Sequence, residues 1–234
     1  MFFNDYPDFF QTSRTTPQPG RLNLRYEAIM GENRDILQGA RVLDIASHDG
    51  RWSFAALKSG AAHVVGIEAK QELVDNAVAT FSKYGVDPAT REFVCGDIFE
   101  VMAQQTFEVD VVMCLGFLYH TLRYNELLSL IRRLNPKYLI IDTVVATLGG
   151  GPIVKLRAEA ADREHNAVPD QQSYGNTVLS GKPNMKALRV MLRAYGFTIT
   201  KVSDWGSLLR DNPDAEAVTT YARGERVTMR CDSD

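Results

Sequence analysis

The sequence predicts an α/β fold in which a mostly parallel sheet is covered by helices on both faces. Two observations lead to this fold class. From residue 41 onward, short apolar segments alternate with amphipathic ones, as expected for a chain that builds strand–helix–strand units. The apolar segments contain few polar residues, which is typical of strands that are buried on both faces.

The strands are expected where the apolar segments are short. Five alternate with helices and two follow later, at 41–46, 63–68, 91–97, 109–116, 137–145, 197–205 and 226–231. The expected helices lie at 51–60, 71–85, 98–105, 119–134 and 184–196. In the helix at 71–85, for example, Leu73, Val74 and Phe81 share one face and Gly85 provides the end.

Two regions interrupt the alternation. Residues 1–38 are expected to form an extended, aromatic arm over 1–20 and a helix over 21–38. Residues 146–183 contain three consecutive glycines and many charged and polar residues. We expect there a long irregular insert that faces the substrate, and a disordered decoration is the alternative. The predicted organisation is an arm and helix at 1–38 and one α/β domain at 39–234.

Composition limits the class of protein. The chain has 234 residues, is 45% hydrophobic and 24% charged, and therefore reads as a soluble globular protein. A net charge of −3 does not favour nucleic acid as a partner, although a local basic patch would still allow it. No apolar run approaches the ~18 residues of a membrane span. The three cysteines form no CxxC or Cys/His cluster, so we expect reduced thiols, no metal site and a cytoplasmic location. Monomer and homodimer both remain open.

The segment VLDIASHDGRWS at 42–53 indicates a binding loop after the first strand. Asp44 lies near the end of that strand, and a turn of small residues leads through Gly50 into a helix. Such a turn lets the backbone approach a ligand, and the helix N-terminus offers free N–H groups. An ordinary strand-to-helix turn is the alternative. The residues expected to line the loop are Asp44, Ala46, Ser47, His48, Gly50, Trp52 and Ser53.

Further signals follow the next three strands. Glu68 ends the second strand and is followed by Ala69; a carboxylate there can accept hydrogen bonds from both hydroxyls of a ribose. Asp97 follows the third strand, where capping of the next helix is an alternative role. The fourth strand ends in Cys114, Leu115 and Gly116. The carboxyl ends of parallel strands meet at one edge of the sheet, where open α/β sheets bind ligands.

Together these segments resemble the class I S-adenosylmethionine-dependent methyltransferases, whose first motif is an acidic residue followed by glycines at alternate positions. Ala46 and His48 stand at two of the usual glycine positions, and only Gly50 matches. This departure also argues against a nicotinamide dehydrogenase, because a pyrophosphate needs the close approach that the full glycine fingerprint gives.

The resemblance implies a Rossmann-like seven-stranded sheet, S-adenosylmethionine as the cofactor and methyl transfer as the reaction. It also implies that Asp97 holds the adenine amino group, that Ile98 and Phe99 flank the adenine ring, and that Cys114 to Gly116 lie beside the methionine part.

Three residues are candidates for the chemistry. Methyl transfer to an alcohol needs a base beside the methyl group, and His120 follows the fourth strand with a side chain suited to that work near neutral pH. Tyr119 would orient the acceptor or the cofactor. Asp142 lies in an apolar strand, where an acid needs a purpose or a partner; it would be a base, a metal ligand or the partner that orients His120. A helix-start residue bonded to backbone is the alternative for His120.

The segment GFLYH at 116–120 also resembles the tRNA wobble-uridine enzymes that transfer a carboxymethyl group, and that resemblance implies that Tyr119 holds the extra carboxylate of their cofactor. The chain lacks their large N-terminal extension and has no evident basic tract. The main hypothesis is therefore O-methylation of a small molecule, either a sugar or a secondary metabolite. The alternatives are a tRNA wobble-uridine modifying enzyme and a non-catalytic S-adenosylmethionine-binding module.

Overall fold

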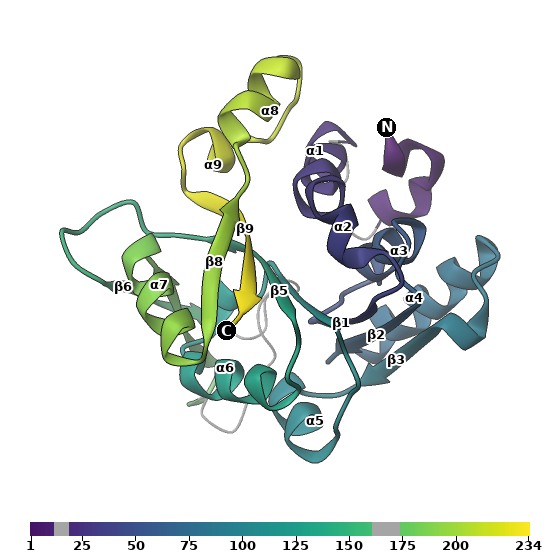
Figure 1. Cartoon of the computed structure of the whole chain (residues 1–234), viewed down its shortest axis with the longest axis horizontal. Helices are drawn as coiled ribbons and strands as arrows, with labels where there is room; N and C mark the ends of the chain where they lie inside the picture. The colour runs from purple at the N-terminus through teal and green to yellow at the C-terminus, as the bar shows by residue number, and fades with distance from the viewer. Residues whose placement is uncertain (12–18, 161–173) are drawn as a thin grey trace.

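A central seven-stranded sheet forms the body of the molecule in the computed structural model, which describes residues 1–11, 19–160 and 174–234 (Figure 1). The strand order is β3-β2-β1-β4-β5-β9-β8, and only β9 runs antiparallel to its neighbours. The strands are β1 Arg41–Ile45, β2 His63–Glu68, β3 Arg91–Cys95, β4 Val111–Leu115, β5 Tyr138–Val144, β8 Phe197–Val202 and β9 Arg226–Ser233. The predicted Rossmann-like α/β fold and all seven strands of its sheet are confirmed.

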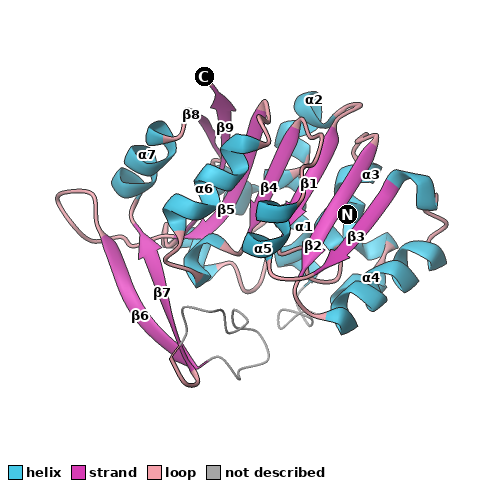
Figure 2. Cartoon of the chain, turned by 90° about the horizontal axis from the view of Figure 1, so that it is seen from below, coloured by secondary structure: helices cyan, strands magenta, loops and turns pink. Residues whose placement is uncertain are grey.

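Helices cover both faces of this sheet (Figure 2). One core lies under α5 Ile98–Gln104, α6 Tyr124–Arg133 and α7 Met185–Ala194. The core on the opposite face lies under α1 Pro19–Ile29, α2 Arg34–Leu37, α3 Arg51–Lys58 and α4 Gln71–Lys83. The side chains of both cores are buried almost completely, because parallel strands with helices on both sides leave little of the sheet to water.

The start of the chain differs from the extended arm that we expected. Residues Phe2–Asp5 and Pro7–Phe10 form two short 3₁₀ helices, and Phe3 and Phe9 are buried against Phe54 and Trp52 of α3. Aromatic side chains bury large apolar areas, so the arm folds back onto the helix layer. The helix expected over 21–38 is divided into α1, a 3₁₀ turn at Gly31–Asn33 and α2.

The insert also contains regular structure, where we expected an irregular segment. Strands β6 Val154–Ala160 and β7 Thr177–Pro183 pair as an antiparallel hairpin that projects from the body of the molecule (Figure 2), and residues 161–173 of the expected insert lie outside the described residues. Two short helices, α8 Trp205–Asp211 and α9 Thr219–Ala222, follow β8 and were not predicted.

Candidate functional site

The loop after β1 has the backbone shape of a glycine-rich turn, although two of its residues are not glycines. Ala46 and His48 have φ values of 54° and 53°, and Gly50 has 73°. These angles lie in the left-handed region, which side chains with a Cβ adopt only at a cost. A Cβ on Gly50 would lie 3.0 Å from both Phe81 and Phe93, so only glycine fits there. Ala46 and His48 thus occupy the usual glycine positions and take a glycine-like conformation.

Buried acidic and basic side chains lie beneath this loop. Asp44 accepts a hydrogen bond of 2.8 Å from the Ser53 hydroxyl, and its complete burial raises the pKa of its carboxyl to about 7. Burial would also raise the pKa of Asp49, but Arg51, at 2.6 Å, and His48 hold it well below its usual range. Asp49 and Arg51 are a buried ion pair that we did not predict. Of the loop residues, Ala46 and His48 are partly exposed and Ser53 is fully buried.

Glu68 joins the loop after β1 to the loop after β2. Its two carboxylate oxygens accept hydrogen bonds from the backbone N–H groups of His48, at 2.9 Å, and Lys70, at 3.1 Å. A carboxylate has about four lone-pair positions, so these bonds leave capacity for a ligand. The Ser47 hydroxyl nearby is buried and has no hydrogen-bond partner among the described residues, which leaves a polar atom for a ligand to satisfy.

Asp97 stands at the end of the neighbouring strand β3, which pairs with β2. One of its carboxylate oxygens, Oδ1, accepts from the backbone N–H groups of Phe99 and Glu100 and so caps α5. The capping role that we considered as an alternative is therefore present. The second oxygen, Oδ2, has no hydrogen-bond partner within the described parts of the chain, and Asp97 is partly exposed. Capping and ligand binding can coexist in this residue.

Several residues expected at the cofactor site belong to the apolar cores. Trp52 is packed edge-on against Phe3 with a centroid distance of 5.6 Å. The thiol of Cys114 is buried, which raises its pKa to about 12. Phe99 is buried and carries the guanidinium of Arg123 over its ring at 3.7 Å. Ile98 and Leu115 are buried as well, whereas Ala69 and Gly116 are partly exposed at the sheet edge.

His120 lies in a 3₁₀ turn after β4 and faces the insert. Its Nδ1 atom is 3.5 Å from Oε2 of Glu159 on β6, too long for a well-formed hydrogen bond but close enough for an ion pair when the imidazole is protonated. Burial lowers the pKa of His120, Glu159 raises it, and Arg226 and Arg157 lower it; the net direction is down. The imidazole is therefore neutral near pH 7 and able to accept a proton. Tyr119 packs beside it, with a distance of 4.1 Å between the ring centres.

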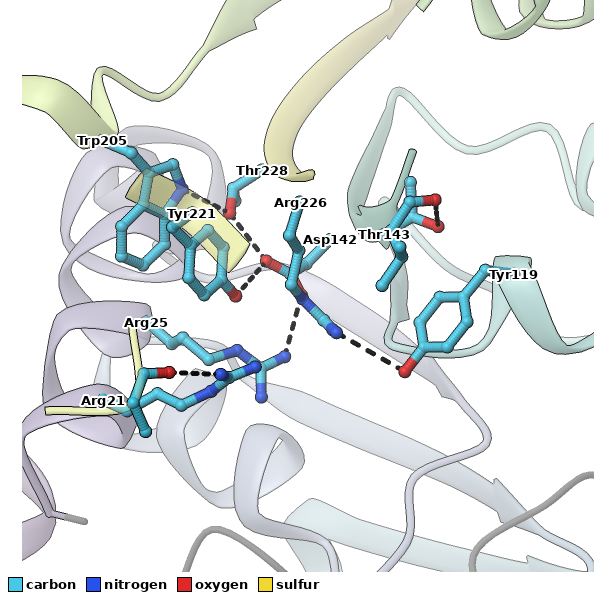
Figure 3. Close-up of polar contacts among 11 residues, drawn as sticks. Arg21, Arg25, Tyr119, Asp142, Thr143, Trp205, Tyr221, Arg226 and Thr228 are labelled. Carbon is cyan, nitrogen blue, oxygen red and sulfur yellow. Dashed lines mark hydrogen bonds and ion pairs between the residues drawn. The ribbon is translucent and has the colours of Figure 1, made fainter. Parts of the chain in front are cut away.

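Asp142 is fully buried and does not orient His120, which corrects that expectation. Its carboxylate accepts hydrogen bonds from Arg25, Arg226, Tyr221 and Thr228 at 2.7–3.0 Å (Figure 3). Burial opposes its charge, but Arg226 and Arg25 hold the pKa of this carboxyl well below its usual range. An acid so strongly held is a poor base, and it locks β5 to β9 and α1.

Some residues of this region carried no recognisable signal in the sequence. Glu159 lies in the insert, and its approach to His120 depends on the hairpin. Arg226 opens β9, 84 residues after Asp142. The buried acid was the one available signal, because a charge inside an apolar strand requires a partner. Among the residues that the structure describes, no three His, Cys, Asp or Glu side chains form a group that could hold a metal ion. None of the described helices is long and apolar enough to cross a bilayer.

Comparison with known proteins identifies the type of domain. Residues 42–136 match a family model described as "Methyltransferase domain". No curated relative matches the chain. An S-adenosylmethionine-dependent methyltransferase from Mesorhizobium loti is 13% identical, with a TM-score of 0.61, over 89% of this chain and 99% of the other.

Two further structures share the fold. The N-terminal domain of EvdMO1 with SAH bound is 18% identical, with a TM-score of 0.59, over 95% of this chain and 85% of the other. The 1,6-didemethyltoxoflavin-N1-methyltransferase from Burkholderia thailandensis, with S-adenosylhomocysteine, is 20% identical, with a TM-score of 0.58, over 92% and 82%. Residues 42–136 thus match a methyltransferase domain, and the chain has the fold of S-adenosylmethionine-dependent methyltransferases, as the resemblance predicted.

Proposed function

We propose that this chain is an S-adenosylmethionine-dependent methyltransferase that transfers a methyl group to a hydroxyl of a small-molecule acceptor. The observation that carries the proposal is the row of acceptors at the carboxyl edge of the sheet. The glycine-like loop after β1, Glu68 after β2 and Asp97 after β3 lie on three neighbouring strands. This order suits a ligand that has a sugar and a base but no phosphate, because a pyrophosphate would need the full glycine fingerprint that this loop lacks.

Individual residues of the site match particular parts of the cofactor. Glu68, which is already held by two backbone N–H groups, would accept from the ribose hydroxyls. The Oδ2 atom of Asp97 would accept from the adenine amino group. When bound, S-adenosylmethionine supplies a methyl group on a positively charged sulfur. After the transfer, that sulfur is part of a neutral thioether, which is the leaving group.

His120 would act as the base at the acceptor. Its imidazole accepts the proton of the acceptor hydroxyl while the acceptor oxygen forms its bond to the methyl carbon and the bond from that carbon to sulfur breaks. The imidazolium that results is stabilised by Glu159, whose carboxylate lies 3.5 Å away. Tyr119, beside His120, would position the acceptor. A net charge of −3 favours a small molecule over RNA as this acceptor.

Calorimetry with S-adenosylmethionine tests the cofactor assignment. Asp97→Ser keeps a helix-capping oxygen but removes the carboxylate, so we expect binding about tenfold weaker than in the wild type. Asp87→Ser is the matched control, because Asp87 also caps a turn, through the N–H of Ala89, far from the site. Wild-type protein that binds no S-adenosylmethionine would overturn the proposal, and equal affinities in the two variants would overturn the role of Asp97.

A further inference from the structure

Three arginines gather around one acid beside the proposed active site. Arg21 and Arg25 are four residues apart on α1 and therefore lie on the same face of that helix. Arg226 reaches the same place from β9. Figure 3 shows their guanidinium groups grouped around Asp142 and Tyr221. Arg21 and Arg226 lie over the ring of Tyr221 at 5.5 and 5.8 Å. We call these three residues the arginine cluster.

The positive charge of the arginine cluster exceeds what Asp142 can neutralise. The carboxylate carries one negative charge and accepts from Arg25 and from Arg226, so two of the three positive charges are left over within the described parts of the chain. The side chains of Arg226 and Arg25 are only 7% and 13% exposed, and water screens them poorly. Burial lowers the pKa of Arg21, as do Arg25 and Arg226, while Tyr221 raises it. Positive charges that lie close together and are partly buried repel one another, which is unfavourable unless an anion binds among them.

The arginines also have hydrogen-bond donors to spare. A guanidinium carries five N–H donors. The Nε atom of Arg25 is buried and has no partner among the described residues. Among the described residues, the Nη1 atom of Arg226 reaches only the Tyr119 hydroxyl, at 3.5 Å, which is at the limit of a hydrogen bond. Arg21 donates to a backbone carbonyl, that of Ala217. Together they offer the planar, forked donors that carboxylates and phosphates bind.

The cluster is contiguous with the proposed chemistry. A Cβ on Gly116, at the end of β4, would lie 3.3 Å from Nη2 of Arg226, so the guanidinium lies against the loop that leads to His120. The guanidinium of Arg226 also lies 5.4 Å from the ring centre of Tyr119, and that ring packs on His120. An anion on the arginine cluster would therefore lie one side chain away from the base.

We infer that the arginine cluster binds a carboxylate, or a similar oxyanion, carried by the methyl acceptor. The inference rests on the proposed function and narrows it: the acceptor is an acid that also bears the hydroxyl to be methylated. The cluster would hold the acidic group while His120 takes the hydroxyl proton.

Acetate is the smallest probe of this site. The test follows the side-chain Nε–H signal of Arg226 by NMR while acetate is added, first to the free protein and then to protein saturated with S-adenosylhomocysteine. We expect a saturable shift with a millimolar midpoint in both states and none with acetamide, which has the same shape but no charge. Arg21→Gln should weaken acetate binding about tenfold, whereas Arg34→Gln, an exposed arginine on α2, should leave it unchanged.

Three outcomes would overturn the inference. They are no saturable shift with acetate, the same midpoint in Arg21→Gln as in Arg34→Gln, and loss of acetate binding when S-adenosylhomocysteine is bound. The last would assign the arginine cluster to the carboxylate of the cofactor. Calorimetry of S-adenosylhomocysteine on the same samples keeps the two proposals separate, because protein that binds acetate but no S-adenosylhomocysteine would refute the proposed function and not the anion site.

Discussion

Ala46 and His48 in the loop after β1 hold backbone conformations that favour glycine, with φ values of 54° and 53°. A left-handed residue with a Cβ costs about 1–2 kcal/mol relative to its right-handed form. This strain occurs at two positions of one loop. Strained backbone of this kind is usually found in loops that bind ligands. The sequence showed which glycines were missing, but it could not show that the backbone would keep their shape.

Replacing Ala46 with glycine should stabilise the protein. The Ala46→Gly variant removes the Cβ strain and adds some chain entropy to the unfolded state, so we expect the free energy of unfolding to rise by about 0.5–1 kcal/mol. Urea denaturation measures it. Ala62→Gly, at an exposed position without a positive φ, should instead have a neutral or small destabilising effect. A loss of stability in Ala46→Gly would show that the backbone at Ala46 is not strained.

The pair His120–Glu159 gives a prediction on the base itself. Burial lowers the pKa of His120 and Glu159 raises it, so Glu159→Gln should lower this pKa further. Arg157, which lies 3.5 Å from Glu159, lowers the pKa of His120, and Arg157→Gln should raise it. An NMR titration of the imidazole checks both directions without any knowledge of the acceptor.

The activity should follow the same directions. Neutral His120 is the active form, so the acidic limb of the pH–rate profile should move to lower pH in Glu159→Gln and to higher pH in Arg157→Gln. Shifts of the same sign in both variants would show that the hairpin does not tune the base electrostatically. His120 and Glu159 are 39 positions apart in the sequence, which explains why the sequence alone could not pair them.

At the scale of elements, the seven strands of the sheet were predictable because each is a short apolar segment between turn residues. The hairpin was missed although β6 carries a visible signal: Val154, Leu156 and Ala158 alternate with polar residues, which is the period of a strand. The glycines and charges around it favoured an irregular segment. Helices α8 and α9 have seven and four residues, too few to show a helical period.

A side-chain hydrogen bond helps to anchor the hairpin to the body of the molecule. The hydroxyl of Tyr124, at the start of α6, donates to the backbone carbonyl of Gly181 on β7 at 2.6 Å and is buried. Tyr124→Phe removes the donor and leaves a buried carbonyl unpaired, which costs about 1–3 kcal/mol. We expect faster hydrogen exchange in β6 and β7, with the amides of β1 and β4 unchanged.

Tyr195→Phe is the control for this experiment. Tyr195 is also partly buried against the same core, after α7, and its hydroxyl takes part in no hydrogen bond described here. Its removal should leave exchange in the hairpin as in the wild type. Equal exchange in Tyr124→Phe and the wild type would show that side-chain packing, rather than this bond, holds the hairpin in place.

At the scale of the whole molecule, the net charge bears on the kind of partner but does not show how charges are arranged within the site. The chain carries −3 overall, yet two arginines contact one buried acid and a third lies beside it over Tyr221. A second buried acid, Asp44, lies beneath the cofactor loop without a cation among the described residues that contact it. Which charged side chains become neighbours depends on which strand ends lie side by side, and this is known only once the sheet has folded. Composition limits the class of protein, but the electrostatics of the site depends on the three-dimensional arrangement.

Asp44 therefore makes the stability of the whole molecule depend on pH. Its pKa is about 7 in the folded protein and ordinarily 3.8, so the folded state binds its proton more tightly than the unfolded state does. The contribution to stability is complete below about pH 4 and is lost as pH rises through about 7, by up to about 4 kcal/mol.

Asp44→Asn keeps an oxygen that accepts from Ser53 and does not titrate. Urea denaturation from pH 4 to 8 should show the stability of Asp44→Asn rising relative to the wild type as pH increases. The exposed control Asp75→Asn should not show this rise. A constant difference for Asp44→Asn as well would mean that Asp44 is already ionised at pH 4 in the folded protein, and that burial does not govern its charge.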